Sequence, residues 1–341
     1  MNNNRGFFVI ALVLLVVINL AISWIRSDQF QHLETIYFDE NSDFEHPARV
    51  STVEEGYLVV GKNKMQSYND RGELRWEKTL FSYNSISDSH GDTLVLADDK
   101  AGDVFVLNRN GDLLYTHRGI GRLIKAKVFD AGAVGVLTDD NRVYVYSPKL
   151  GKMLGIELPL GTIVDFDYSE DNKRLAVVLI DRTLNSYLNV CTVSGEITSG
   201  IILEKDLAYG VKADSDRIRV VSDSSVSAYD YSGTLIERTD VEGAVTRFDL
   251  RRHLIGYKAD PGETVRSLDS KFFVPAEAMQ VLTMGNRLLV SLPTTVQILD
   301  PGGRVVRQID AAADSVAVHS ISEESFLLEY ANRIEFYKLN R

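Results

Sequence analysis

The sequence predicts an all-β protein, a β-propeller of four-stranded blades, preceded by one N-terminal transmembrane helix. Two observations predict the propeller: alternating or β-branched runs recur in pairs at a spacing of roughly 38 residues, and a glycine turn follows the second run in most pairs. A third observation, a long apolar run before the first pair, predicts the membrane helix. The pairs begin near Tyr57, Thr93, Val134, Leu175, Ile218, Leu254, Leu288 and Phe326.

The spacing fits one blade per pair, because a strand and its turn use about 8 to 12 residues and four strands make a blade. The repeat runs without a break from about residue 50 to the end, so one large ring is expected although 341 residues could form two average domains. We expect eight blades. Seven remain possible, because the unit around 251–274 is the least regular.

The N-terminus predicts a short cytoplasmic tail over residues 1–5, a transmembrane signal anchor over 6–26 and a linker over 27–31. The apolar run at 7–25 is long enough for a helix to cross most of a hydrocarbon core of about 30 Å. A cleavable signal peptide is the alternative, because Ala21 and Ser23 have the small-residue spacing of a cleavage site. The run is longer than the apolar region of a typical signal peptide, so we expect the anchor to remain uncleaved.

The anchor predicts a single-pass protein of the cell membrane with its N-terminus inside and its propeller outside. Arg5 favours an internal tail, although Arg26 at the other end of the run makes the charge bias small. We therefore expect an extracytoplasmic domain of the cell envelope.

The predicted propeller covers residues 32–341 and is closed by a strand from its N-terminal end. The last unit supplies strands at 315–319, 325–330 and 333–339, which leaves its blade one strand short. The segment at 32–40 reads as a strand without a neighbouring partner. Pairing of this strand with the last unit would close the ring and remove an exposed sheet edge.

Glycines mark the turn between the third and fourth strands of most units. A tight turn of this kind needs a positive φ angle, which glycine adopts without steric cost. No phosphate-binding loop of the GxxxxGK[ST] type is present. The turn glycines are Gly72, Gly111, Gly151, Gly195, Gly233 and the pair Gly302 and Gly303.

Composition excludes several classes of function. A formal net charge of −11, a pI near 5.1 and the lack of a basic cluster argue against nucleic acid binding. Cys191 is the single cysteine, so neither an intramolecular disulfide nor a thiolate zinc site can form. Its apolar surroundings predict a small buried core residue. No cofactor and no metal are expected.

Residues 69–76, Asn-Asp-Arg-Gly-Glu-Leu-Arg-Trp, resemble the repeat of PQQ-like β-propellers, and residues 109–115 are similar with Tyr115 in place of the tryptophan. The whole chain resembles a bacterial family of membrane-anchored PQQ-like, or quinoprotein-like, β-propellers of unknown function. Quinoprotein dehydrogenases of this fold hold their quinone with adjacent cysteines, which this chain lacks. The resemblance therefore implies an envelope scaffold, with Trp76 packed between neighbouring blades.

Catalytic motifs are also missing. The histidines form no HExxH motif and no GxSxG nucleophile elbow is present, so we expect no enzymatic activity. Ser89, His90 and Asp92 bring three triad residue types together. Neighbours in sequence rarely converge on one proton path, and we interpret this segment as a polar turn.

Acidic residues follow the second strand of consecutive units. Equivalent loops of a propeller open on one face of the ring, so these residues would form a negative crown that could bind a basic segment of a partner protein or a divalent cation. The alternative is a purely local role, because aspartate is a favoured turn residue. No calcium loop of the D-x-[DN]-x-[DN]-G type is present. The candidate partner-binding residues are Asp98, Asp99, Asp139, Asp140, Asp181, Asp223 and Asp260.

The sequence thus predicts a non-enzymatic, membrane-tethered propeller that acts as a protein-interaction scaffold or sensor in the cell envelope. Two alternatives remain open, a degenerate quinoprotein-like enzyme and a propeller that binds a small ligand or glycan in its central channel. An enzyme requires convergent polar residues in the channel, and a glycan binder requires exposed aromatic residues on one face.

Overall fold

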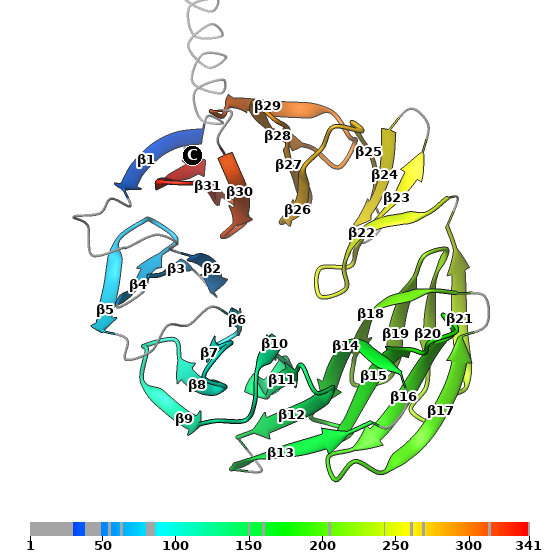
Figure 1. Cartoon of the computed structure of the whole chain (residues 1–341). Coiled ribbons are helices and arrows are strands. Elements are labelled where there is room, and N and C mark those ends of the chain that lie inside the picture. Colours follow the sequence, from blue (N-terminus) through cyan, green and yellow to red (C-terminus); the bar gives the residue numbers. More distant parts are fainter. Residues whose placement is uncertain are drawn as a thin grey trace, which may run out of the picture.

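Eight antiparallel sheets surround a central opening in the computed structural model of the chain (Figure 1). Each sheet has four strands, so the predicted all-β propeller is confirmed with eight blades rather than seven. The structure describes residues 30–37, 49–53, 56–61, 64–79, 86–148, 151–158, 161–203, 206–241, 243–259, 262–267, 270–312 and 315–339.

The blades are numbered in chain order, and the strands of each blade are given in order from the channel outward. Blade 1 contains β2 (Arg49–Val53), β3 (Gly56–Val60), β4 (Lys64–Asn69) and β5 (Leu74–Thr79). Blade 2 contains β6 (Ile86–His90), β7 (Thr93–Asp98), β8 (Asp103–Asn108) and β9 (Leu113–His117). Blade 3 contains β10 (Leu123–Val128), β11 (Val134–Thr138), β12 (Arg142–Ser147) and β13 (Lys152–Glu157). Blade 4 contains β14 (Thr162–Ser169), β15 (Arg174–Ile180), β16 (Ser186–Thr192) and β17 (Ile197–Leu203).

The second half of the ring repeats this arrangement. Blade 5 contains β18 (Ala208–Ala213), β19 (Ile218–Ser222), β20 (Ser225–Tyr229) and β21 (Leu235–Asp240). Blade 6 contains β22 (Val245–Asp249), β23 (Leu254–Ala259), β24 (Gly262–Ser267) and β25 (Ser270–Val274). Blade 7 contains β26 (Gln280–Met284), β27 (Arg287–Ser291), β28 (Thr295–Leu299) and β29 (Val305–Asp310). Blade 8 contains β30 (Ser315–Ser320), β31 (Ser325–Tyr330), β32 (Arg333–Leu339) and β1 (Phe30–Tyr37).

The core lies between the blades. Middle strands such as β7 and β11 are buried along their whole length, because each sheet has a neighbouring sheet on both faces. Between blades 3 and 4, for example, Phe129 packs against Phe166 and Tyr168 with ring centroids about 6 Å apart. Cys191 is fully buried in the same cluster, as predicted, and burial raises the pKa of its thiol to about 11.

The ring closes by pairing of β1 with β32 in antiparallel register, from Phe30 opposite Leu339 to Tyr37 opposite Arg333. β1 begins at Phe30, slightly before the strand predicted at 32–40. Its Ile36 packs on a cluster that includes Tyr57 and Phe336, and so joins blade 8 to blade 1.

All predicted turn glycines except Gly302 have the expected positive φ angle. Gly72 and Gly111 have φ angles of 82° and 74°, and Gly151, Gly195, Gly233 and Gly303 are also positive. A Cβ atom at Gly111 would lie 2.9 Å from the ring of Trp76. The Trp76 indole donates a hydrogen bond to the Arg109 carbonyl oxygen at 2.8 Å, so Trp76 packs between blades 1 and 2 as predicted.

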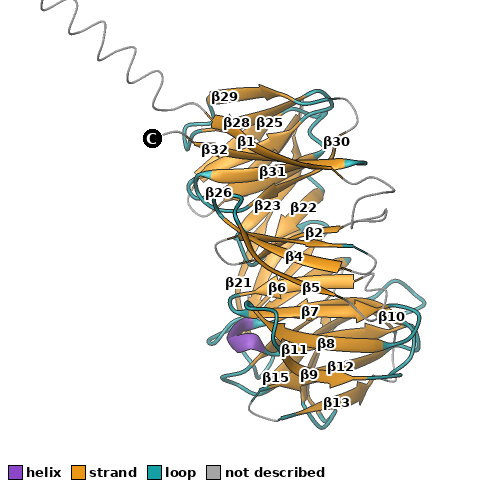
Figure 2. Ribbon diagram, turned by 90° about the vertical axis from the view of Figure 1, so that its left-hand side faces the viewer, coloured by secondary structure: helices purple, strands orange, loops and turns teal. Residues whose placement is uncertain are grey.

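The ring has two faces. We call the face that carries the turns between second and third strands, together with the connections between blades, the crossover face. The opposite face carries the first–second and third–fourth turns, and we call it the hairpin face. In Figure 2 the short 3-10 helix η1 (Asp130–Gly132), the first turn of blade 3, marks the hairpin face.

The predicted tail and anchor precede the described residues. Within the ranges that the structure describes, no helix is long and apolar enough to cross a membrane.

Candidate functional site in the central channel

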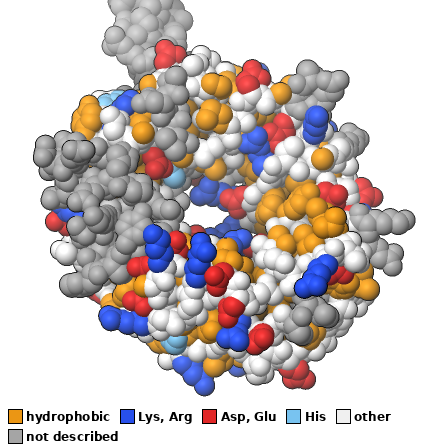
Figure 3. All heavy atoms as spheres, in the orientation of Figure 1, with side chains coloured by type: hydrophobic (Ala, Val, Ile, Leu, Met, Phe, Trp, Pro, Cys, Tyr) orange, Lys and Arg blue, Asp and Glu red, His pale blue; other side chains and the backbone are white. Residues whose placement is uncertain are grey.

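The innermost strands of the blades line the channel, and two cavities of about 580 and 420 Å³ lie within it. The larger cavity is bounded by blades 2 to 7 and the smaller by blades 1, 2, 6 and 8. A volume of 580 Å³ is in the range of small-molecule sites. Basic and acidic side chains surround the opening in the space-filling view (Figure 3).

Acidic and amide side chains of the channel bind the backbone of the next blade. Each inner strand is a sheet edge, and its N–H groups need partners that the sheet itself does not supply. A side chain from the preceding blade provides the acceptor in several places. These hydrogen bonds run from Val128 N–H to Asp88 at 2.8 Å, from Val211 N–H to Asp165 at 3.0 Å, from Ala213 N–H to Asp167 at 2.8 Å and from Val318 N–H to Gln280 at 2.6 Å.

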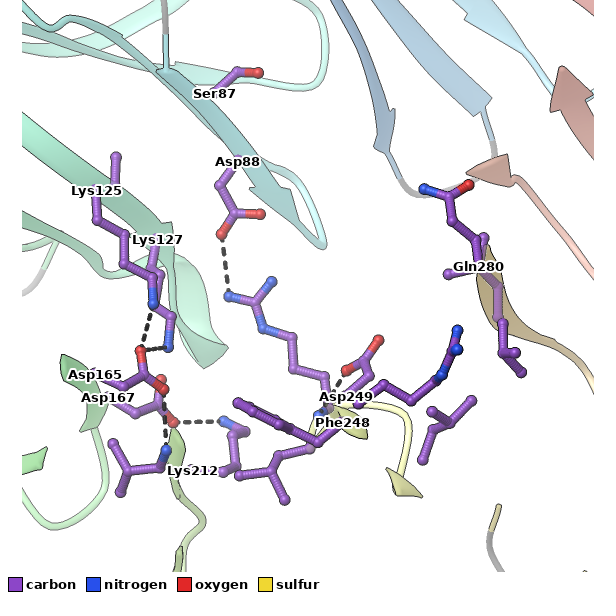
Figure 4. A pocket seen from close by; sticks show the side chains of 18 of the residues that line it. Ser87, Asp88, Lys125, Lys127, Asp165, Asp167, Lys212, Phe248, Asp249 and Gln280 are labelled. Atoms are coloured by element: carbon purple, nitrogen blue, oxygen red, sulfur yellow. Dashed lines mark hydrogen bonds and ion pairs between the residues drawn. The ribbon is translucent and has the colours of Figure 1, made fainter. Parts of the chain in front are cut away.

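Asp165 also holds two lysines of blade 3. Lys125 Nζ and Lys127 Nζ lie 2.7 and 2.6 Å from its Oδ1 atom, while its own side chain is only 5% exposed. Burial raises the pKa of the Asp165 carboxyl, but the two ammonium groups outweigh burial and lower this pKa below its ordinary value. Two positive charges therefore share one carboxylate at this point of the channel wall (Figure 4).

Lys212 of blade 5 lies between two acids. Its Nζ atom is 2.8 Å from Asp130 and 3.1 Å from Asp167, and its side chain is 7% exposed. Burial raises the pKa of Asp167 despite the nearby ammonium groups. For Lys212, burial lowers the pKa, but Asp167 and Asp130 outweigh this effect and raise it. Asp130 also pairs with His90 at 3.2 Å, and the hydrogen bond from His90 lowers the Asp130 pKa.

Arg251 joins opposite sides of the ring. It belongs to the first turn of blade 6, and its guanidinium reaches Asp88 of blade 2 at 3.2 Å and the carbonyl oxygen of Val128 in blade 3. Arg251, Asp88 and Asp249 line both cavities, so this turn and its ion pair separate the larger cavity from the smaller one. The irregular unit around 251–274 in the sequence includes this turn.

The wall of the larger cavity formed by blades 6 and 7 carries an apolar patch beside the charged residues Arg247, Asp249 and Arg251. Phe248 and Met279 keep 36% and 51% of their surface exposed, and Leu250, Val281 and Leu282 continue the wall. Phe248 lies against the backbone of Gly210, where a Cβ atom would collide with its ring. Its ring therefore joins blades 5 and 6 on one side and borders the cavity on the other.

The Ser89, His90 and Asp92 segment does not form a catalytic arrangement. The Ser89 hydroxyl donates to the Thr52 carbonyl oxygen, His90 pairs with Asp130, and Asp92 pairs with Arg109 at 3.3 Å. Among the residues that the structure describes, no group of three or more His, Cys, Asp or Glu side chains is arranged to hold a metal ion.

The predicted acidic residues lie in equivalent second–third turns of blades 2 to 5, on the crossover face. Most of their carboxylates form hydrogen bonds or ion pairs with nearby residues of the chain. Asp98 accepts hydrogen bonds from the N–H groups of Lys100 and Ala101, and Asp223 accepts one from the N–H group of Leu207. Asp181 accepts hydrogen bonds that lower its pKa, the strongest from the Thr183 hydroxyl. The predicted crown residues Asp98, Asp99, Asp139, Asp140, Asp181 and Asp223 are all described, whereas Asp260 lies outside the described residues.

Of the six described crown residues, Asp139 and Asp140 are exposed. Asp140 pairs with Arg142 at 3.4 Å, with about half of its side chain still exposed. The part of the crown that is accessible to a partner is therefore concentrated in blade 3.

The charged channel was not predicted. Its signal in the sequence is the alternation of charges within first strands, Lys125 with Lys127 and Asp165 with Asp167, since alternate residues of a strand point to the same side. The contact between Arg251 and Asp88 carries no comparable signal, because the two residues lie far apart in the chain.

Comparison with known proteins identifies a family and a fold. The model of the family DUF5711, described as a family of unknown function, matches residues 27–242, which is more than half of the chain, so the chain belongs to this family. No curated protein matches the sequence.

Solved structures show the same fold at low identity. BamB from Moraxella catarrhalis is 10% identical with a TM-score of 0.57, and the match covers 91% of this chain and 100% of that one. The computationally designed protein Ika8 is 12% identical with a TM-score of 0.63, covering 90% and 99%. Sqt1 from Saccharomyces cerevisiae is 12% identical with a TM-score of 0.59, covering 91% and 100%.

Proposed function

We propose that this member of the DUF5711 family is a non-enzymatic, membrane-tethered β-propeller that binds a protein partner outside the cytoplasm through its crossover face. The observation that carries the proposal is the direction of β1. Its first residue, Phe30, lies opposite Leu339, and its last residue, Tyr37, lies opposite Arg333 beside the second–third turn of blade 8. The chain therefore enters the ring on the hairpin face.

The predicted anchor at 6–26 ends only a few residues before Phe30. A short connection to the hairpin face would hold that face next to the membrane. The crossover face, with its acidic turns, would then point away from the membrane and remain accessible to a soluble or membrane-bound partner.

The exposed acids of this face support a partner with a basic segment. Asp139 and Asp140 lie side by side in one tight turn, and exposed charges mainly steer a partner and set its association rate. A partner attracted in this way should bind more slowly at high salt.

The channel supports a non-enzymatic role. Its buried lysine Lys212 forms ion pairs with Asp130 and Asp167. Its trans-channel arginine Arg251 forms an ion pair and a backbone hydrogen bond, and both side chains hold blades together. A perturbed pKa in such a network has a structural explanation, although convergent polar residues are also a property of catalytic sites.

The experiment is affinity capture with the full chain from detergent-solubilised membranes, with cross-linking and identification of the captured proteins. Asp139→Asn and Asp140→Asn together should reduce capture of the main partner several-fold, because they remove the exposed charge but keep residues suited to a turn. The matched control is Asp171→Asn with Asp216→Asn, two exposed acids of the hairpin face. Equal capture by wild type and by the Asp139 and Asp140 variant would refute the proposed binding face.

A further inference from the structure

We infer that the larger channel cavity is a binding site for a small organic anion with an apolar body, such as an aryl or acyl carboxylate. The inference is independent of the partner face, because the cavity lies inside the ring. It rests on the cavity itself, on a partly exposed lysine ammonium at one wall and on exposed apolar side chains at the opposite wall.

The polar part of the proposed site lies at Lys125 and Lys127. Both ammonium groups use the same oxygen atom of Asp165, and the other oxygen of Asp165 accepts the Val211 N–H. One carboxylate oxygen thus accepts hydrogen bonds from two lysines. Lys127 also donates to the carbonyl oxygen of Phe166 at 3.0 Å, whereas the Lys125 side chain is 39% exposed and borders the cavity.

The other cations of this wall have acids of their own. Lys212 has Asp167 and Asp130, Arg251 has Asp88, and Arg247 has Glu263. The partly exposed Lys125 ammonium has hydrogen-bond donors to offer, and a carboxylate is a suitable acceptor for it.

An apolar patch of the opposite wall supplies the second part of the proposed site. Phe248 and Met279 are large hydrophobic side chains that retain exposed surface and line the same cavity as Lys125. Figure 4 shows Lys125 and Phe248 on different sides of the open space. Contact between this apolar surface and water is unfavourable, so an apolar ligand body that covers the surface would gain binding free energy.

The test is calorimetric titration of the full chain in detergent with 2-naphthoate, which combines a carboxylate with an aromatic body. Acetate lacks the body, and 2-naphthalenemethanol lacks the charge. We expect saturable binding of 2-naphthoate and much weaker binding of the other two compounds. A titration of detergent alone removes the contribution of micelles.

Lys125→Gln should weaken 2-naphthoate binding by about tenfold or more, because it removes a charge-assisted hydrogen bond but keeps a polar side chain of similar size in the cavity wall. Met279→Gln should weaken it several-fold. Lys152→Gln, an exposed lysine on the outer strand of the same blade, should leave it unchanged. The inference is overturned if 2-naphthoate shows no saturable binding in the low millimolar range, or if Lys125→Gln binds it as tightly as wild type.

Discussion

Asp167 of blade 4 accepts a hydrogen bond from the Ala213 N–H of blade 5 at 2.8 Å, so a carboxylate of one sheet completes the backbone hydrogen bonding of the next. The same relationship links Asp88 to Val128 and Asp165 to Val211. The acids of the channel are thus part of the seams between blades. This explains why charged residues occupy buried positions of an inner strand.

Removal of the Asp167 side chain should destabilise the ring. Asp167→Ala leaves the Ala213 N–H without its acceptor and Lys212 with Asp130 alone, which should cost about 2 kcal/mol of unfolding free energy. Chemical denaturation followed by circular dichroism measures this change. Asp171→Ala removes an exposed acid of the same blade and should change the unfolding free energy by less than about 0.5 kcal/mol. Equal effects of the two variants would contradict a role of Asp167 in the seam.

Asp165 should make the fold sensitive to acid. The pKa of Asp165 is lower in the folded protein than its ordinary value of 3.8, so its ionised form stabilises the fold. This stabilisation is complete above pH 3.8 and is lost as the pH falls through the lower folded-state pKa. The melting temperature of wild type should therefore decrease more steeply in this range than that of Asp165→Asn.

Asp167 supplies a control of opposite sign. Burial raises its folded-state pKa, because burying the ionised carboxylate costs free energy that protonation removes. The contribution of Asp167 to the free energy of unfolding therefore increases as the pH falls through that pKa. Asp167→Asn should therefore lose stability more steeply on acidification than wild type. Parallel melting curves for all three proteins across the acid range would contradict both assignments.

Much of the fold could be predicted from the sequence, because it depends on local signals. Alternating runs indicate strands, and glycines such as Gly72 and Gly111 indicate turns with positive φ. The period predicts eight blades, although the irregular unit around 251–274 left seven possible until the structure showed eight sheets. The incomplete last unit also indicates that a strand from the N-terminal end completes blade 8.

The channel could not be predicted in the same way, because its contacts join residues far apart in the chain. Arg251 and Asp88 meet only because blades 6 and 2 lie across the ring from each other. For the acidic crown, the repeat predicts where the residues lie. The sequence does not reveal that the carboxylates of Asp98 and Asp223 accept hydrogen bonds from nearby backbone N–H groups.

The N-terminal strand should be needed for a stable ring. A chain that starts at Glu45 lacks β1, which exposes the edge of β32 and removes Ile36 from its cluster with Tyr57 and Phe336. Its melting temperature should be lower by about 5 °C or more than that of a chain that starts at Ser27. Scanning fluorimetry of the two proteins measures the difference. Equal melting temperatures would show that β1 does not contribute to closure.

Arg251 should hold the first turn of blade 6 in place across the channel. Arg251→Met removes the hydrogen bonds to Asp88 and Val128, and amide hydrogen exchange of residues 250–253 should become roughly tenfold faster. Arg252→Ala is the matched control, because the side chain of this neighbouring residue lies 3.9 Å from Asp249 of its own blade. Unchanged exchange in Arg251→Met would show that the turn keeps its position without the ion pair.

The orientation of the ring at the membrane gives the last prediction. The predicted anchor at 6–26 follows a short tail with Arg5, and a 19-residue apolar segment can direct export of the chain behind it and then remain as a tether. Protease added to intact, wall-stripped cells should therefore degrade the propeller, and the protein should stay with the membrane during carbonate washing. A cytoplasmic enzyme assayed in the same samples should stay intact, which shows that the cells remained closed. A protected propeller would place the ring in the cytosol and remove the basis for an external partner face, whereas a freely soluble propeller would show that the chain is cleaved near Ala21 and Ser23.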